Sequence, residues 1–137
     1  MAAGQSDREF ITELHQAYGA TLPVQYPSLS ELYSLISRAR LVVCNNSAAL
    51  HISEALETPC VAITGPSDPV RWGIYRSHSR TVIRSEELAC HPCREKRCVL
   101  PDNWPCMERI SVHDVIEVLE DLGIGVAVPA ALRASRV

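Results

Sequence analysis

The sequence lacks the features of a membrane-spanning or exported protein. No apolar run approaches the roughly 20 residues that a transmembrane helix needs, and the first residues, Met1 to Ser6, have neither the basic start nor the apolar core of a signal peptide. It also lacks basic blocks and basic residues interleaved with aromatic ones, and its 13 basic and 16 acidic side chains give a net charge of −3. We therefore expect a cytoplasmic protein that does not bind nucleic acid and that binds any anionic ligand locally.

Repeats and low-complexity stretches are absent as well, and the chain is short. Its 137 residues, 47% hydrophobic and 21% charged, match one ordinary domain with a modest core. The length excludes a large multidomain enzyme, and the composition excludes a disordered tail. We assign residues 1–123 to one domain, with a cysteine-rich loop at 85–110, and residues 124–137 to a C-terminal tail.

Four segments carry the sequence pattern of a helix. Three begin with a capping box, in which a serine is followed three residues later by an acidic residue. These pairs are Ser6 and Glu9, Ser28 and Glu31, and Ser111 and Asp114. Apolar residues at helical spacing follow each pair and predict helices that end near Gly19, Ala39 and Gly123. A further helix is predicted over 48–56, with Pro59 marking its end.

Two continuous apolar runs, Leu41–Cys44 and Cys60–Thr64, have the pattern of strands buried on both faces of a parallel sheet. A short strand is predicted at Thr81–Ile83 and an extended piece around Leu22–Tyr26. Gly and Pro residues predict a loop over 65–69.

Helices that alternate with buried strands indicate an α/β domain, a Rossmann-like parallel sheet with flanking helices. Only three or four strands are visible, whereas such sheets usually have five or six. We therefore expect the chain to be part of a longer protein that has at least one more βα unit upstream.

Ligands of open α/β sheets bind outside the carboxyl ends of the strands, so the turns after Cys44 and Thr64 are the first candidates for a site. After the first of these strands come the polar residues Asn45, Asn46 and Ser47, and the small Ala48 and Ala49 then open a helix. Free amides and the helix dipole favour a phosphate there, and small side chains let it approach.

His51 lies four residues after Ser47 on the same helical face, where a ring nitrogen can reach the same anion. An alternative interpretation is that Asn46 or Ser47 only caps the helix and that His51 is a hydrogen-bonded residue beneath it. The second loop, Gly65 to Trp72, faces the same crevice, although Gly and Pro are also typical of a rigid surface turn.

The segment from Leu41 to His51, followed by Pro59, an apolar strand, Gly65–Pro66–Ser67–Asp68–Pro69 and Trp72, resembles the C-terminal half of glycosyltransferase family 9. This family contains the bacterial heptosyltransferases of lipopolysaccharide core assembly. The resemblance runs from about residue 4 to residue 122 and includes the Ser-Leu-Ser-Glu-Leu helix and the cysteine-rich loop in the family's order.

The resemblance implies the C-terminal half of a GT-B fold, which holds the nucleotide-sugar, typically ADP-heptose. Asn46, Ser47, Ala48 and His51 fall on the family's Asp-Ser/Thr-Gly-x-x-His motif, with Asn46 in place of Asp and Ala48 in place of Gly. The donor-contacting residues implied or predicted here are Asn46, Ser47, Ala48, Ala49, His51, Gly65, Pro66, Ser67, Asp68 and Asp7. Asp7, or else Glu9, falls near the family's ribose-binding carboxylate.

The expected function is therefore donor binding in an inverting glycosyltransferase of lipopolysaccharide or related glycan assembly. The resemblance implies a glycolipid acceptor, an N-terminal acceptor domain that supplies the catalytic base, and a location at the inner face of the bacterial inner membrane. Transfer of this kind requires no metal, and this chain alone is expected to be inactive, with no catalytic residue of its own. The alternative is a noncatalytic nucleotide-sugar-binding module or a zinc-stapled interaction module.

Four of the six cysteines, Cys90, Cys93, Cys98 and Cys106, lie within seventeen residues. Four thiolates including one Cys-x-x-Cys pair suffice for a structural zinc site in a reducing compartment, and His91 is a spare ligand. An iron–sulfur cluster, disulfides and unliganded thiols remain alternatives. A thioredoxin-like redox pair does not fit, because such a motif should leave a strand directly and open a helix. The other two cysteines, Cys44 and Cys60, are predicted to be core residues.

Overall fold

A computed structural model describes residues 1–18, 23–93, 97–100 and 104–125. The chain divides into two compact units, Met1–Arg38 and Ala39–Val137, and the boundary between them lies inside residues 1–123, which were predicted as one domain. None of the helices in these described ranges has the length and apolar character needed to cross a bilayer.

The first unit contains a 3₁₀ turn, η1 (Gln5–Asp7), and two helices, α1 (Arg8–Tyr18) and α2 (Leu29–Ser37). Helix α2 begins as predicted, because the Glu31 carboxylate accepts hydrogen bonds from the backbone N–H and hydroxyl of Ser28. The predicted box at Ser6 and Glu9 is wrong. The N–H of Gly4 donates instead to the Asp7 carboxylate (2.8 Å), so helical structure starts earlier, with η1 leading into α1.

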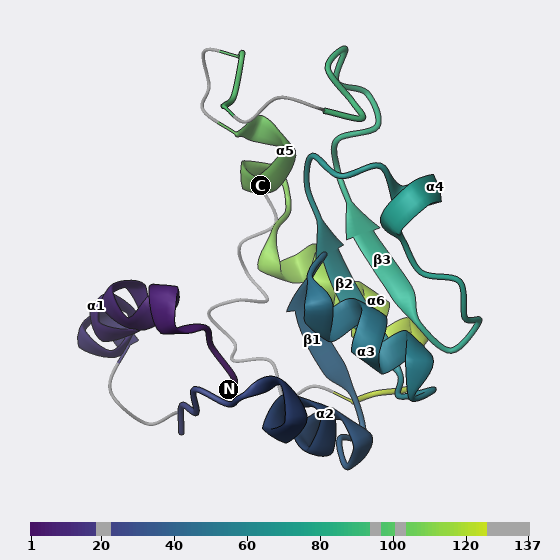
Figure 1. Ribbon diagram of the computed structural model, residues 1–137. Coiled ribbons are helices and arrows are strands. Elements are labelled where there is room, and N and C mark those ends of the chain that lie inside the picture. Colours follow the sequence, from purple (N-terminus) through teal and green to yellow (C-terminus); the bar gives the residue numbers. More distant parts are fainter. Residues whose placement is uncertain (19–22, 94–96, 101–103, 126–137) are drawn as a thin grey trace. The chain divides into compact units, whose positions relative to one another are not determined.

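The second unit is built on a three-stranded parallel sheet, as Figure 1 shows. Its order is β1 (Val42–Asn45), β2 (Cys60–Thr64) and β3 (Arg80–Ile83), with β2 in the centre. Helix α3 (Ala48–Ala55) connects β1 to β2 and packs on one face, whereas α6 (Val112–Asp121) packs on the other face against β2 and β3. The predicted α/β fold is therefore confirmed.

Each face of the sheet has its own apolar cluster. Leu50 of α3 packs with Cys60 and Ala62, and all three are fully buried. On the opposite face Val61 and Val82 pack with Leu119 of α6. Because successive strand residues point to opposite faces, the unbroken apolar run of β2 supplies both clusters.

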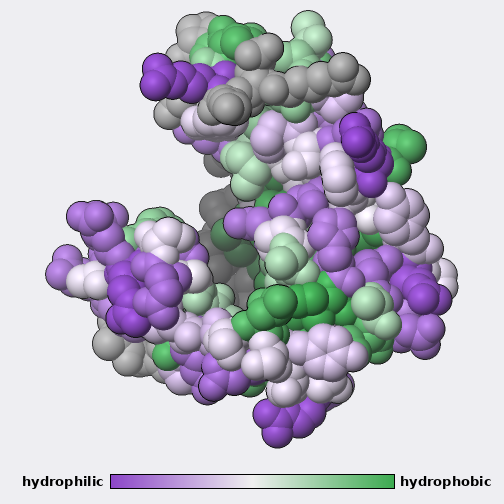
Figure 2. All heavy atoms as spheres, viewed as in Figure 1, coloured by the Kyte–Doolittle hydropathy of each residue, from purple (hydrophilic) through white to green (hydrophobic). Residues whose placement is uncertain are grey.

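Strand β1 differs from its prediction, because it is not buried on both faces. Its residues alternate between half-buried and exposed, and Val43 is 47% exposed. Figure 2 shows hydrophobic residues reaching the surface in the region of β1 and α3. Cys44 is accordingly only half-buried, whereas Cys60 is buried as predicted. The apolar run identified a strand but not its place at one side of the three-stranded sheet.

Two short helices were not predicted: α4 (Pro69–Trp72), within the expected loop, and α5 (Pro105–Glu108), within the cysteine-rich segment. The last helix, α6, begins at the predicted capping box of Ser111 and Asp114. Of the predicted tail, residues 126–137 lie outside the described part, and Ile124 packs against the α6 side of the core.

Candidate donor-binding site

The predicted site lies at the carboxyl edge of the sheet, where β1 and β2 end side by side. The parallel register pairs Asn45 with Ile63, so the turns after these strands leave the sheet at one edge (Figure 1). The N–H of Asn46 still donates to the carbonyl of Ile63 (3.2 Å), which extends the pairing into the first turn. The sheet thus positions the start of α3 directly.

The N-terminus of α3 carries no side-chain cap. Ser47 is the N-cap residue in extended conformation, but its hydroxyl accepts no capping hydrogen bond. The first N–H groups of a helix have no partner within the helix, so this end presents donors and the positive end of the dipole. Ser47 and Ala48 are exposed, and Ala48, the first residue of the helix, has only a methyl group as its side chain.

Trp72, at the end of α4, connects the two turns. The Asn46 side-chain amide donates to the Trp72 carbonyl (3.2 Å). The Trp72 ring packs edge-on against His51, with ring centroids 6.4 Å apart and planes at 67°. The structure therefore brings Asn46 and His51 together beside the segment that follows β2, with the His51 side chain exposed.

A positive charge belongs to the same group. The Arg71 guanidinium lies over the Trp72 ring, 5.0 Å from its centre, and the side chain is exposed. Stacking on an aromatic face leaves the guanidinium N–H groups at its rim available to an anion. Neither Arg71 nor Trp72 was among the predicted donor contacts, although the loop Gly65 to Trp72 was expected to face the same crevice.

The residues of the predicted loop Gly65–Asp68 have two structural roles. Asp68 caps α4, since its carboxylate accepts from the N–H groups of Val70 (2.9 Å) and Arg71 (3.3 Å). Gly65 is buried, and its carbonyl accepts from the hydroxyl of Ser85 (2.9 Å). These contacts build α4 and hold the loop in place, and direct donor contact by Gly65, Pro66, Ser67 and Asp68 stays a prediction.

Glu54 is a buried acidic residue that the sequence analysis did not single out. Its carboxylate accepts from the N–H groups of Tyr75 (2.8 Å) and Arg76 (3.0 Å). Because Glu54 belongs to α3, these bonds fix the chain that follows α4 to the helix carrying Ser47 and His51.

Asp7 belongs to the first unit. Its carboxylate accepts from the N–H of Gly4 and from the hydroxyl of Ser6 (3.3 Å), so its observed partners are local. The contact of Asp7, or of Glu9, with a ribose remains a prediction.

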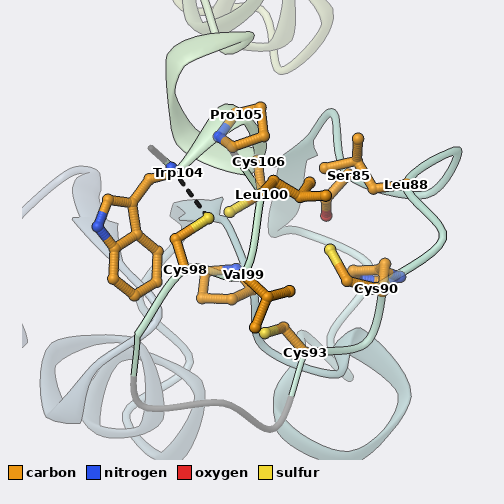
Figure 3. Close-up of a pocket in the computed structure, with 12 residues that line it drawn as sticks. Ser85, Leu88, Cys90, Cys93, Cys98, Val99, Leu100, Trp104, Pro105 and Cys106 are labelled. Atoms are coloured by element: carbon orange, nitrogen blue, oxygen red, sulfur yellow. Dashed lines mark hydrogen bonds between the residues drawn. The ribbon is translucent and has the colours of Figure 1, made fainter. Parts of the chain in front are cut away.

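The cysteine-rich segment packs behind the loop that follows β2. The N–H of Cys93 donates to the carbonyl of Pro66 (2.9 Å), and a side chain added at Gly65 would come within 2.2 Å of the Met107 sulfur. All four predicted cysteines line one small cavity here (Figure 3). Their thiols are free.

The thiols of this segment lie close enough to influence one another. Burial raises the pKa of the Cys106 thiol, and the negative charge that Cys98, Cys90 and Cys93 would carry as thiolates raises it further. Within the described ranges, no group of three or more His, Cys, Asp or Glu side chains is placed so that it could hold a metal ion.

The fold and these turns together define an α/β domain with a Rossmann-like sheet and a candidate anion site at its carboxyl edge. Residues 8–103 match the model of glycosyltransferase family 9 (heptosyltransferase). The match covers well over half of the chain, and the chain belongs to this family.

Curated relatives and a solved structure agree with this assignment. The chain is 26% identical over 125 residues to the lipooligosaccharide heptosyltransferase 2 of two strains of Campylobacter jejuni, which covers 88% of this chain and 39% of each relative. It shares its fold with the crystal structure of a family 9 glycosyl transferase from Veillonella parvula, with a TM-score of 0.65 and 24% identity. That likeness covers 88% of this chain and 35% of the other.

Proposed function

We propose that this chain provides the donor-binding side of an inverting glycosyltransferase that uses a nucleoside diphosphate heptose, with ADP-heptose as the expected donor. The relatives named as heptosyltransferases support the sugar class. The observation that carries the proposal is the uncapped start of α3 at the carboxyl edge of the sheet, next to His51. In the whole protein, a second domain would bring the glycolipid acceptor and the catalytic base.

Four kinds of group would hold the donor diphosphate. The first-turn N–H groups after Ser47 and the Ser47 hydroxyl would donate hydrogen bonds to it. From the side of Trp72, His51 would donate a hydrogen bond and the guanidinium of Arg71 would add positive charge. Ala48 has a side chain small enough to let phosphate oxygens reach the backbone.

This arrangement suits departure of a diphosphate. When the acceptor hydroxyl attacks the anomeric carbon, the bond to the donor phosphate breaks and negative charge grows on the leaving oxygen. Donors already fixed by the sheet and by Trp72 would stabilise that charge without reorganisation. The inverted product follows because attack and departure occur on opposite faces of the sugar ring.

Calorimetric titration of the full chain with ADP, UDP and GDP at millimolar concentration tests the binding step, and ADP is expected to bind most tightly. Ala48→Asp places a carboxylate where the phosphate would lie and is expected to abolish binding. Since an acidic residue is favourable in the first turn of a helix, this variant should still fold. His51→Ala should weaken binding by about tenfold, the loss typical of one charge-assisted hydrogen bond.

Ala55→Asp is the matched control, because it adds the same charge at the other end of α3, where Ala55 is exposed. It should bind ADP as the unmodified chain does. Absence of heat with all three nucleotides, or unchanged ADP binding by Ala48→Asp, would overturn the proposal.

A further inference from the structure

A second group of candidate ligands lies outside the proposed donor site, in the segment between β3 and α6. Cys90 and Cys93 follow β3, Cys98 lies in the stretch 97–100, and Cys106 belongs to α5. These four cysteines line one cavity of about 10 Å³ (Figure 3). A space of that size holds roughly one water molecule, so it suits a single ion better than a multi-iron cluster.

The remaining lining is mostly apolar, with Leu88, Val99 and Leu100 among its members. One nitrogen stands out: Nε2 of His91 is buried without a hydrogen-bond partner, and His91 lines the same cavity. The four thiols and the unpartnered imidazole nitrogen together offer sulfur and nitrogen ligands and no oxygen ligand. Sulfur and imidazole ligands favour zinc over calcium or magnesium.

Cys98 also has a supporting contact. Its sulfur accepts the backbone N–H of Trp104 (3.2 Å), as drawn in Figure 3. Hydrogen bonds from neighbouring groups to ligand atoms orient and stabilise the ligands of metal sites. The sequence pattern, the shared cavity, the unpartnered His91 nitrogen and this contact therefore point to the same chemistry.

We propose that Cys90, Cys93, Cys98 and Cys106 bind one zinc ion as a closed, structural site. On binding, each thiol gives its proton to solvent and each sulfur forms a bond to the ion, so four protons are released for one Zn²⁺ bound. The sulfurs move inward to the zinc–sulfur distance of about 2.3 Å. His91, which lines the same cavity, would not be a fifth ligand; its Nε2 would donate a hydrogen bond to a ligand sulfur.

The consequence concerns the loop after β2. The backbone N–H of Cys93 donates a hydrogen bond to the carbonyl of Pro66, and Cys106 is followed by Met107, whose side chain packs against Gly65. Zinc bound to Cys93 and Cys106 would therefore hold this loop in place. The ion would position this loop and would not itself contact the donor phosphates at α3. Its presence does not depend on the identity of the donor.

Metal analysis of the full chain, purified with a thiol reductant and without chelator, tests the proposal. About one equivalent of zinc per chain is expected. The double variant Cys90→Ser/Cys93→Ser should retain less than a tenth of an equivalent, whereas the control Cys44→Ser, which alters a half-buried thiol outside the segment, should retain full zinc.

A second measurement covers the case in which the double variant does not fold. Addition of Co²⁺ to the metal-free, reduced unmodified chain should produce intense thiolate-to-cobalt charge-transfer absorption, which stoichiometric Zn²⁺ should abolish. Less than a tenth of an equivalent of zinc together with no cobalt absorption would overturn the proposal. So would an iron–sulfur chromophore, two disulfides found by mass spectrometry after non-reducing purification, or full zinc retention by the double variant.

Discussion

Gly73 ends α4 at a point where the backbone leaves room only for hydrogen. A methyl group there would come within 2.1 Å of the carbonyl oxygen of Pro69. Backbone cannot move aside as a side chain can, so Gly73→Ala is expected to distort the last turn of α4. The expected loss is about 1–3 kcal/mol in the free energy of unfolding, measured by urea denaturation, as for other overpacked sites.

Gly65→Ala is the matched comparison, because its methyl group would meet the flexible Met107 side chain rather than backbone. We expect a smaller loss for this variant than for Gly73→Ala. A larger loss for Gly65→Ala than for Gly73→Ala would show that the backbone of Pro69 does not pack against Gly73 as described. Trp72 precedes Gly73, so Gly73→Ala should also weaken the contact of Trp72 with His51.

At the scale of single residues, local signals in the sequence locate only part of the site. Ser47 and His51 are recognisable because a strand, an N-cap residue and a histidine follow one another along the chain. The strand pattern placed the loop Gly65 to Trp72 at the same crevice, but the contacts of Arg71 and Trp72 with one another and with His51 depend on the packing of α4, which no local pattern encodes. Glu54 likewise acts on backbone groups 21 and 22 residues away.

Among the helices, α6 allows the contribution of its capping residue to stability to be tested by changing the pH. Burial of the Asp114 carboxyl raises its pKa, but hydrogen bonds from the backbone N–H and hydroxyl of Ser111, together with the Arg84 guanidinium, outweigh this and leave the pKa below its usual value of 3.8. A lowered pKa in the folded state stabilises the fold above the unfolded-state pKa. This stabilisation disappears as the pH falls through the folded-state value.

Asp114→Asn is therefore expected to cost about 1 kcal/mol at pH 6, within the range of helix-cap losses. The difference from the unmodified chain should shrink progressively below about pH 4. Urea denaturation at pH 6, 5, 4 and 3 measures this. Glu120→Gln, an exposed change at the other end of α6, is the control and should show neither the loss nor its dependence on pH. A loss that stayed constant from pH 6 to pH 3 would exclude the ionised carboxylate as its cause.

Helix starts were predictable where a serine and an acidic residue form a capping box, as at Ser28 and Ser111. Helix α4 also has a local signal, because Asp68 followed by Pro69 is a favoured N-cap and first-turn pair. The many turn-forming residues around it predicted a loop instead. Helix α5 follows Trp104, an N-cap residue that has a left-handed backbone (φ 66°) and makes no side-chain cap, so Pro105 is the local signal at its start.

For the molecule as a whole, alternating helices and apolar strands predicted the parallel sheet but not how its burial is distributed. The runs Leu41–Cys44 and Cys60–Thr64 look alike in sequence. In the structure, β2 lies between two strands and two apolar clusters, whereas β1 pairs with β2 alone among the described strands. Strand order is set by tertiary packing, so equal hydrophobicity does not give equal burial.

Two register partners make this difference measurable. Val43 of β1 and Val61 of β2 lie opposite one another, with exposures of 47% and 0%. Val61→Ala leaves a cavity against Val82 and Leu119 and is expected to cost about 2 kcal/mol, between the usual losses for removing one and three buried carbons. Val43→Ala removes the same atoms from a partly solvated site and should cost at most about 0.5 kcal/mol. Urea denaturation of the two variants gives both values, and equal losses would mean that the face of β1 carrying Val43 is covered as fully as the core of the sheet.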